Sequence, residues 1–333
     1  MKLKTVVFAL LISFLTLPLQ ACSGSYASFS DTRLGYFDTV CTITGYADSR
    51  GDFEKSADAL FSLIDECNKL FDIYNDHEGI NNIKTINDNA GRQAVKVDAK
   101  IIGLLSFSLE MYGETDGALN IMIGALTRVW HKYRTENDNR LPSSEELESA
   151  AMHISPDSLV IDAEASTVYI SDPEASLDVG AVAKGYAARL ILDALPDTSL
   201  LSAVIDLGGN IVTYGTKPDG SPWKVAVGKG TSGEYLKVFE LTGLSVVTSG
   251  DYQRFYEVDG VRYHHIIDPS TGYPAGKCSQ VSVVCADPAL ADAMSTALFV
   301  SGAGNFEELA EKYGLYIIAI TDDKTVEAGR LGQ

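Results

Sequence analysis

The sequence feature that most constrains the fold is a run of strands in residues 203–257. Apolar, β-branched segments follow one another there, and the glycine-rich pairs Gly208-Gly209 and Asp219-Gly220 stand between them. Strands joined by short turns of this kind favour antiparallel pairing. This part of the chain therefore predicts a largely antiparallel sheet.

Helical segments are mixed with strands elsewhere, without strict βαβ alternation. Apolar positions that alternate in steps of four and three from Phe53 to Tyr74 predict a long helix with one buried stripe. We expect further helices at 102–112, 183–195, from Pro288, from Asn305 and after a capping box at 142–146. Strands are expected at 33–46, 280–285 and 315–320, and a hairpin at 159–171. Residues 76–91, rich in Asn and Asp, are predicted to be a loop. The pattern indicates the α+β class, a mixed, largely antiparallel sheet with flanking helices.

The charge balance narrows the possible partners. Lys and Arg number 26 against 45 Asp and Glu, which gives a net charge of −19. Binding to nucleic acid by counterion release needs a basic surface, so no nucleic-acid partner is expected. An acidic protein that binds a phosphorylated ligand must supply a local lysine or a bound metal ion.

Residues 1–21 have the layout of a secretory signal. A short basic start precedes an apolar run at 6–19, which is too short for a comfortable transmembrane helix. Ala21 before Cys22 resembles a bacterial lipobox. This predicts a lipidated Cys22 that anchors the protein in the lipid bilayer of the cell membrane, on its extracytoplasmic face. An ordinary signal peptide with an incidental cysteine is the alternative.

The chain after the signal is predicted to begin with a polar tether, residues 22–31. Loss of the two lysines of the signal changes the net charge from −19 to −21. Export permits disulfides, but the remaining cysteines form no CxxC motif, and buried free thiols are the favoured reading. These cysteines are Cys41, Cys67, Cys278 and Cys285.

Two glycine-containing segments are suited to binding an anion. Residues 177–186, Leu-Asp-Val-Gly-Ala-Val-Ala-Lys-Gly-Tyr, join a strand end to a helix start, where free amides and Lys184 favour phosphate. A tight turn followed by an exposed lysine is the structural alternative. Residues 206–210, Asp-Leu-Gly-Gly-Asn, end an apolar strand in a turn open enough for a ligand to approach. A hairpin turn with Asn210 in a left-handed conformation is the alternative there.

A third segment combines two histidines, a turn and a helix. In residues 263–274 the neighbours His264 and His265 precede a Pro/Gly turn, and strand geometry points them to opposite faces. In the helix that follows Asp287, Asp292 and Thr296 lie four residues apart on one face. A carboxylate beside a hydroxyl suits a hard cation, whereas a solvated Asp292 and a Thr296 bonded back to its own helix would be purely structural.

Together these segments resemble the ApbE family, the FAD:protein FMN transferases, whose members are often exported lipoproteins. Four motifs stand in the family's order: Leu-Asp-x-Gly-Ala-x-Ala-Lys-Gly, Asp-x-Gly-Gly-Asn, His-Ile-x-Asp-Pro-x-Thr-Gly and Ala-Asp-Ala-x-Ser-Thr-Ala. The resemblance covers nearly the whole chain after the signal. It implies a single α+β domain, residues 32–333, with FAD in a cleft.

The resemblance also implies roles for individual residues. The Mg²⁺ ligands would be the side chains of Asp292 and Thr296 and the main-chain oxygen of Ala181. His265 would assist catalysis, and His264 would point away. The expected FAD contacts are Phe37, Tyr74, Ala118, Leu119, Asn120, Asp178, Lys184 and Ile266.

The chain departs from the family pattern at three places. Phe37-Asp38-Thr39 stands where many members have Met-Gly-Thr, and Asn120 stands where an aspartate is usual. The loop after Tyr74 lacks a common Ser-Glu pair. These departures bear on the flavin contacts rather than on the metal site.

The activity implied is Mg²⁺-assisted transfer of FMN from FAD to a Ser or Thr hydroxyl of an acceptor protein, with release of AMP. The acceptor would be an exported or membrane redox protein with a short flavinylation motif. Two alternatives stay open: an Mg²⁺-dependent FAD pyrophosphatase that gives FMN and AMP, and a non-catalytic FAD-binding lipoprotein.

Overall fold

A computed structural model describes residues 26–136, 139–252, 254–322 and 324–331. The predicted signal and Cys22 lie outside the described residues, so the statements made about them stay predictions. No helix in these ranges is both long and apolar enough to cross a membrane.

The centre of the fold is an eight-stranded sheet in the order β1-β2-β6-β7-β10-β13-β14-β15. Every neighbouring pair in it is antiparallel, which confirms the predicted α+β class. Its strands are β1 (Ala27–Tyr36), β2 (Thr39–Ala47), β6 (Ser202–Leu207), β7 (Asn210–Tyr214), β10 (Ser245–Gly250), β13 (Gln280–Cys285), β14 (Tyr316–Thr321) and β15 (Lys324–Gly329).

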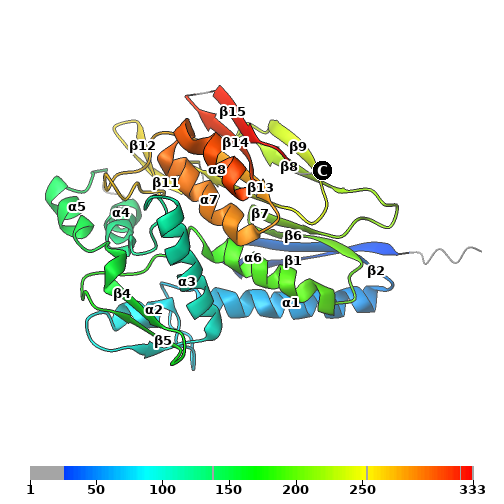
Figure 1. The fold of residues 1–333 in the computed structure, drawn as a ribbon, viewed down its shortest axis with the longest axis horizontal. Coiled ribbons are helices and arrows are strands. Elements are labelled where there is room, and N and C mark those ends of the chain that lie inside the picture. The colour runs from blue at the N-terminus through cyan, green and yellow to red at the C-terminus, as the bar shows by residue number, and fades with distance from the viewer. Residues whose placement is uncertain (1–25, 137–138, 253, 323, 332–333) are drawn as a thin grey trace, which may run out of the picture.

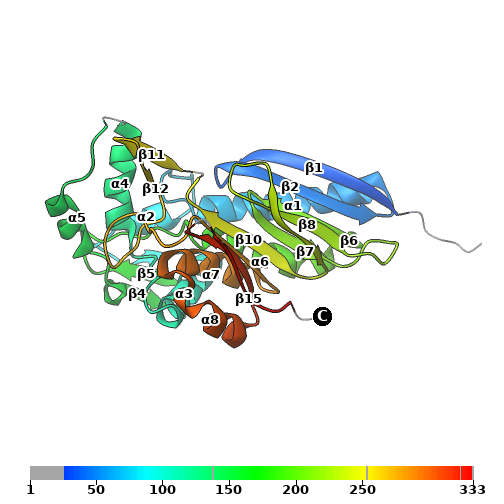
Figure 2. The same ribbon diagram turned by 90° about the horizontal axis from the view of Figure 1, so that it is seen from above.

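The sheet is covered on both faces (Figures 1 and 2). Alternate strand residues point to opposite sides, so Val247 and Val283 pack in the core that the helices share, whereas Val246 and Val284 pack against a hairpin. The hairpin is β8 (Trp223–Gly228) and β9 (Tyr235–Leu241). The helices are α1 (Arg50–Leu70), α6 (Ala183–Ala194), α7 (Pro288–Ser301) and α8 (Phe306–Tyr313).

A group of smaller elements forms the end of the molecule that is on the left of Figure 1. The helices are α2 (Ile83–Asp88), α3 (Ala99–Glu114), α4 (Gly124–Glu136) and α5 (Ser144–Ala151). The strands β3 (Val95–Lys96), β4 (Leu159–Asp162) and β5 (Thr167–Ile170) form a small sheet, and β11 (Phe255–Val258) pairs with β12 (Val261–His264). Trp130 of α4 and Tyr256 of β11 share a buried cluster that fixes this hairpin against α4.

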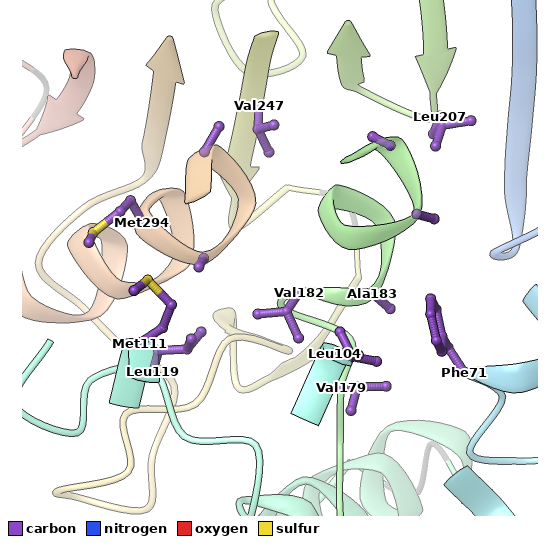
Figure 3. Close-up of a cluster of buried hydrophobic side chains, with 14 of the residues drawn as sticks. Phe71, Leu104, Met111, Leu119, Val179, Val182, Ala183, Leu207, Val247 and Met294 are labelled. Atoms are coloured by element: carbon purple, nitrogen blue, oxygen red, sulfur yellow. The ribbon is translucent and has the colours of Figure 1, made fainter. Parts of the chain in front are cut away.

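The starts of α6 and α7 rest on the main core. Figure 3 shows Val182 and Ala183 at the start of α6, Met294 of α7 and Val247 of β10 in one group of buried side chains. Each of these residues is at most 6% exposed. Both helices therefore pack on a dense core, so the side chains on their outer surfaces keep fixed positions relative to one another.

The structure differs from the sequence-based expectations at several elements. Residues 27–31 of the predicted tether belong to β1 and pair with β2, and residues 83–88 of the predicted loop form α2. Helix α4 and strand β15 were not predicted. The four cysteines within the described ranges are buried and free, as the favoured reading expected: Cys41, Cys67, Cys278 and Cys285.

Candidate functional site

The first part of the candidate site lies where α6 begins against α7. Asp292 of α7 is only 4% exposed, and its Oδ2 accepts a hydrogen bond of 2.7 Å from the main-chain N–H of Gly185. A Cβ on residue 185 would lie 2.3 Å from the Cβ of Asp292. Only glycine at this position lets α6 come close enough for the hydrogen bond to form.

Gly185 can make this hydrogen bond because it lies in the first turn of α6. The first N–H groups of a helix have no acceptor within the helix, and the N-cap Val182 offers no side-chain cap. Ala181 stands directly before Val182, so its main-chain oxygen lies at the start of α6, close in the chain to the N–H that binds Asp292. The contact joins two segments that are 107 residues apart.

Hydroxyl and amide groups complete this side of the site. The Ser249 hydroxyl of β10 lies 3.2 Å from the Thr296 Oγ1 and 2.8 Å from the Ser295 Oγ. The Thr296 hydroxyl therefore faces β10, and Asp292 is buried, so the solvated Asp292 of the structural alternative is wrong. Asn210 also lies beside Asp292, where its side-chain amide lowers the pKa of the carboxyl.

Burial dominates the electrostatics of Asp292. It raises the pKa of the carboxyl above its usual value, while the positive charge of Lys184 and the hydrogen bond from Gly185 oppose the shift. A buried carboxylate of this kind is stable in its charged form only with a cation close by. Lys184 supplies part of that charge, and a divalent cation would supply more.

The turn after β6 lies beside the first hairpin. Asp206 Oδ1 accepts a 2.7 Å hydrogen bond from the Gly209 N–H, and burial raises the pKa of this carboxyl. Gly208 has φ +64°, and a Cβ there would lie 2.1 Å from the Thr39 Oγ1. Positive φ falls on the two glycines rather than on Asn210, so the left-handed Asn210 of the structural alternative is wrong.

The second part of the site surrounds Tyr74. Its ring lies 5.5 Å from the ring of His131 of α4, and Nη2 of Arg134 donates a 3.0 Å hydrogen bond to Nδ1 of His131. Partial burial raises the pKa of the Tyr74 hydroxyl, Asp178 adds to the shift, and Arg134 and Arg254 oppose it. Tyr74 and Asp178, two predicted FAD contacts, therefore belong to one charged cluster.

Asp178 links this cluster to the other predicted FAD contacts. Its main-chain N–H donates a 2.8 Å hydrogen bond to the Ile121 oxygen, so the segment 118–120 lies beside the segment that leads into α6. The Leu119 side chain is 1% exposed and packs in the core, which leaves only its main chain for a ligand. The Asn120 side chain bonds to the main chain of Ile154 and Met122, which is a structural role.

The two histidines have different surroundings. His264 is 8% exposed, its Nε2 lies 2.7 Å from the Ala275 oxygen, and its Nδ1 accepts from the Ile266 N–H. His265 is less buried and contacts the main chain of Arg254. His264 thus has a structural role, and Ile266, whose N–H is already used and whose side chain is buried, can offer a ligand little surface.

Phe37 lies at the tip of the first hairpin, where it is half-buried and its N–H donates to Asn68 Oδ1 at 2.7 Å. Its neighbour Asp38 forms an ion pair of 3.7 Å with Arg254. The hairpin tip is therefore joined to the segment that carries His265.

Sequence reasoning missed Arg134, Arg254 and Ser249. Ser249 is a single hydroxyl within a strand, and the two arginines lie outside the four motifs. No short-range pattern distinguishes them from surface residues, because the pairing of distant segments brings them to the site. One clue was available: arginines are scarce in a chain of net charge −19.

Comparison with known proteins gives a consistent result. The model of the ApbE family matches residues 37–319. A protein from Klebsiella pneumoniae (strain 342) named FAD:protein FMN transferase is 31% identical over 252 residues, 75% of this chain and 76% of the relative. One of the same name from Treponema pallidum is 31% identical over 308 residues, covering 87% and 84% of the two chains.

Solved structures agree in fold. The crystal structure of the ApbE protein from Thermotoga maritima superimposes with a TM-score of 0.78 at 28% identity, and covers 91% of this chain and 97% of the other. The apo form of the flavinyl transferase ApbE from Pseudomonas stutzeri gives a TM-score of 0.77 at 25% identity, with coverage of 91% and 94%.

Proposed function

Because the chain belongs to the ApbE family, we propose that it transfers FMN from FAD to a Ser or Thr hydroxyl of an acceptor protein and releases AMP. The observation that carries the proposal is the Gly185–Asp292 contact. It brings a buried carboxylate to the helix start that carries Lys184 and follows Ala181, which suits a pyrophosphate with a bound cation.

The residues present fit Mg²⁺. The Asp292 carboxylate, the Thr296 hydroxyl and the Ala181 carbonyl are oxygen donors, which Mg²⁺ prefers, and one carboxylate leaves positions for phosphate oxygens and water. When bound, Mg²⁺ would neutralise the charge that develops on the phosphate oxygens. The burial that raises the pKa of Asp292 supports a cation at this site, because a buried carboxylate keeps its charge only beside a positive charge.

The chain's own residues would do the remaining work. Lys184 holds phosphate charge, and the N-cap Val182 provides no side-chain acceptor, so the start of α6 can face an anion. The acceptor hydroxyl attacks the FMN-side phosphorus while the bond from that phosphorus to the oxygen of AMP breaks. The hydroxyl proton passes to His265, and FMN stays on the acceptor through a phosphoester.

The proposal extends to location. Cleavage before Cys22 and lipidation of Cys22 would hold the domain on the extracytoplasmic face of the cell membrane, close to exported or membrane redox acceptors. The lipobox-like sequence at Cys22 supports this. Two acyl chains are enough for stable anchoring.

The test uses FAD, Mg²⁺ and an acceptor from the same genome that carries the Ser/Thr motif. We expect a fluorescent flavin band on the acceptor in a denaturing gel and one AMP for each FMN transferred. An acceptor with alanine at the modified position should stay unlabelled. Rapid AMP release without acceptor would favour the pyrophosphatase, and FAD binding without AMP under any condition would favour the non-catalytic alternative.

A variant tests the site itself. Asp292→Ala should abolish transfer at ordinary Mg²⁺ concentration, because the charged metal ligand is lost. Asp193→Ala, on the exposed side of α6, makes the same change in net charge and should transfer FMN at the wild-type rate. Unchanged transfer by Asp292→Ala would show that the site is assigned wrongly.

A further inference from the structure

Tyr74 lies in a segment that neither a helix nor a strand holds in place. Residues 71–82 join the end of α1 to the start of α2, and the Tyr74 side chain is 54% exposed. Its ring lies 5.5 Å from the ring of His131 of α4, with an angle of 32° between the two planes. An exposed ring on such a connecting segment keeps one position only where other bonds fix its main chain.

The carboxylate of Asp72 supplies these bonds. Its Oδ1 accepts hydrogen bonds from the main-chain N–H groups of Tyr74 at 2.7 Å and of Asn75 at 3.0 Å. Its Oδ2 accepts a bond of 3.1 Å from the Asn75 side-chain amide and lies 3.0 Å from Nε2 of His77. A charged carboxylate only accepts, so Nε2 of His77 carries a proton in this contact. Groups from three residues of one short segment therefore converge on a single side chain.

The Asp72 side chain is itself well placed to hold them. It is 13% exposed, and the His77 side chain is 25% exposed. Burial alone would raise the pKa of the Asp72 carboxyl, but the hydrogen bonds from Tyr74, His77 and Asn75 outweigh burial and lower the pKa below its usual value. The carboxylate is therefore charged at neutral pH, and hydrogen bonds to a charged acceptor are stronger than neutral ones.

The main chain of the same segment is anchored to α2. The N–H of Lys84, in the first turn of α2, donates a 2.9 Å hydrogen bond to the Asp72 main-chain oxygen. The buried side chain of Asn82 donates a 2.8 Å hydrogen bond to the Asn75 main-chain oxygen. The residues on both sides of Tyr74 are thus bonded to the start of this helix, and the side-chain bonds of Asp72 close the segment around the tyrosine.

We propose that Asp72 is a positioning residue for FAD binding: its carboxylate fixes the main chain of Tyr74 and so holds the tyrosine ring where FAD contacts it. His77 assists by binding the second oxygen of the carboxylate. This inference rests on the proposed function, in which Tyr74 contacts FAD. A ring that is fixed before binding loses less conformational freedom when the ligand arrives, so the property that Asp72 controls is the affinity for FAD.

The experiment is a double-mutant cycle on Asp72 and Tyr74. It measures the Kd for FAD by calorimetry, with EDTA present so that FAD is not turned over. Asp72→Ala should weaken the affinity by about 3–10-fold, the range expected when one side chain must be immobilised on binding. In a chain that already carries Tyr74→Ala, the same exchange should change Kd by less than about 2-fold, because Asp72 acts through the tyrosine. A merely structural role would give the same loss with and without the tyrosine ring.

Three further variants serve as controls. Asp76→Ala removes the same charge from the same segment, where the Asp76 side chain is 79% exposed and pairs with Lys84 at 3.2 Å, and it should bind FAD like the wild type. Asp72→Asn keeps an oxygen that can accept from the two N–H groups and should recover most of the lost affinity. His77→Ala removes one bond to the carboxylate and should weaken binding less than Asp72→Ala, again only with Tyr74 present. It carries the test if Asp72→Ala does not fold.

The transfer assay gives a second measurement. In Asp72→Ala the KM for FAD should rise by the same factor as Kd while kcat is retained, whereas a loss of folded protein would lower kcat and leave KM unchanged. The free protein gives a third measurement, which needs no FAD. With ¹⁵N-labelled tyrosine, the amide signal of Tyr74 is identified by its loss in Tyr74→Phe, and this amide should exchange with solvent faster in Asp72→Ala than in the wild type or Asp76→Ala.

Several results would overturn the inference. These are unchanged FAD affinity in Asp72→Ala, equal losses of affinity with and without the Tyr74 ring, an equal loss in Asp76→Ala, and a Tyr74 amide that exchanges equally fast in all variants. If the wild type binds no FAD with or without Mg²⁺, the proposed function falls, while the amide exchange still tests whether Asp72 holds Tyr74.

Discussion

The contact between α6 and α7 can be tested by adding one methyl group. In Gly185→Ala the new Cβ would lie 2.3 Å from the Asp292 Cβ and 2.6 Å from the Pro288 oxygen. Ordinary carbon contacts are about 3.5–4.0 Å, so the helices must separate locally by roughly 1.2–1.7 Å. A displacement of that size breaks the 2.7 Å hydrogen bond from the residue 185 N–H to Asp292.

The expected energy follows from these two effects. Overpacking costs about 1–3 kcal/mol, and the loss of a hydrogen bond to a charged group costs about 1.5–3 kcal/mol. Alanine returns up to about 1 kcal/mol through its higher helix propensity. We therefore expect the free energy of unfolding to fall by about 1.5–6 kcal/mol. FMN transfer should be lost because the Asp292 carboxylate is displaced from the start of α6.

Gly113→Ala is the matched control. Gly113 is exposed in α3, and nothing lies within 4 Å of a Cβ added there, so the same exchange should stabilise the protein by about 0.5–1 kcal/mol. Urea unfolding followed by circular dichroism compares the two variants, and the gel assay compares FMN transfer. If Gly185→Ala were as stable and as active as Gly113→Ala, the close contact would not position the site.

Four further predictions concern the two histidines, Lys184 and the anchor. His265→Ala should lower the rate of FMN transfer by about 10²–10⁴-fold at saturating FAD and Mg²⁺, with FAD binding retained. His264→Ala should lower the stability of the protein but change the rate little. Equal losses of rate in the two variants would remove His265 from the mechanism. Lys184→Met should weaken FAD binding measured by calorimetry, and unchanged affinity would exclude it as a phosphate contact. Cys22→Ser should move the protein out of the membrane fraction, and firm retention there would contradict lipidation. Burial lowers the pKa of both histidines in the folded protein, so the unfolded chain binds more protons below pH about 6.5. The free energy of unfolding should therefore decrease as the pH is lowered below that value. In urea titrations this decrease should be less steep for His265→Gln.

Elements with strong local signals could be predicted from the sequence. The spacing of apolar residues indicated α1, and the capping box at the start of α5 has the predicted reciprocal bonds between Ser143 and Glu146. Asp287, predicted to cap α7, accepts from the N–H groups of Ala289 and Leu290. In each case the information lies within a few residues, so tertiary contacts are not needed to recognise it.

Elements whose signal is ambiguous were missed. In α2, Asn82 and Thr85 cap the helix through reciprocal hydrogen bonds, so the same polar residues that suggest a loop create the helix start. Residues 27–31 look like a polar tether because the Ser and Thr side chains of β1 bond across to β2 on an exposed face, as Ser30 does with Thr44. Composition alone cannot distinguish an exposed edge strand from a linker.

The same distinction applies to the candidate site: its local motifs could be predicted, and its contacts between distant segments could not. Asp292 and Thr296 stand in a recognisable helix motif, but the contact of Asp292 with Gly185 of α6 joins two distant segments, and no single segment contains it. Arg134 and Arg254 come from two further segments, and their charges act on Tyr74. Tertiary structure brings these side chains together, so the sequence could not show it.

The distribution of charged side chains bears on how the candidate site would attract FAD. A chain with a net charge of −19 repels FAD over most of its surface, so attraction must come from a few local cations. Under the proposed function, Lys184, whose positive charge acts on the buried Asp292, would hold phosphate, because a lysine is a compact point charge. The charges of Arg134 and Arg254 act on Tyr74, together with Asp178. These two arginines would therefore be the next cations available to the same anion.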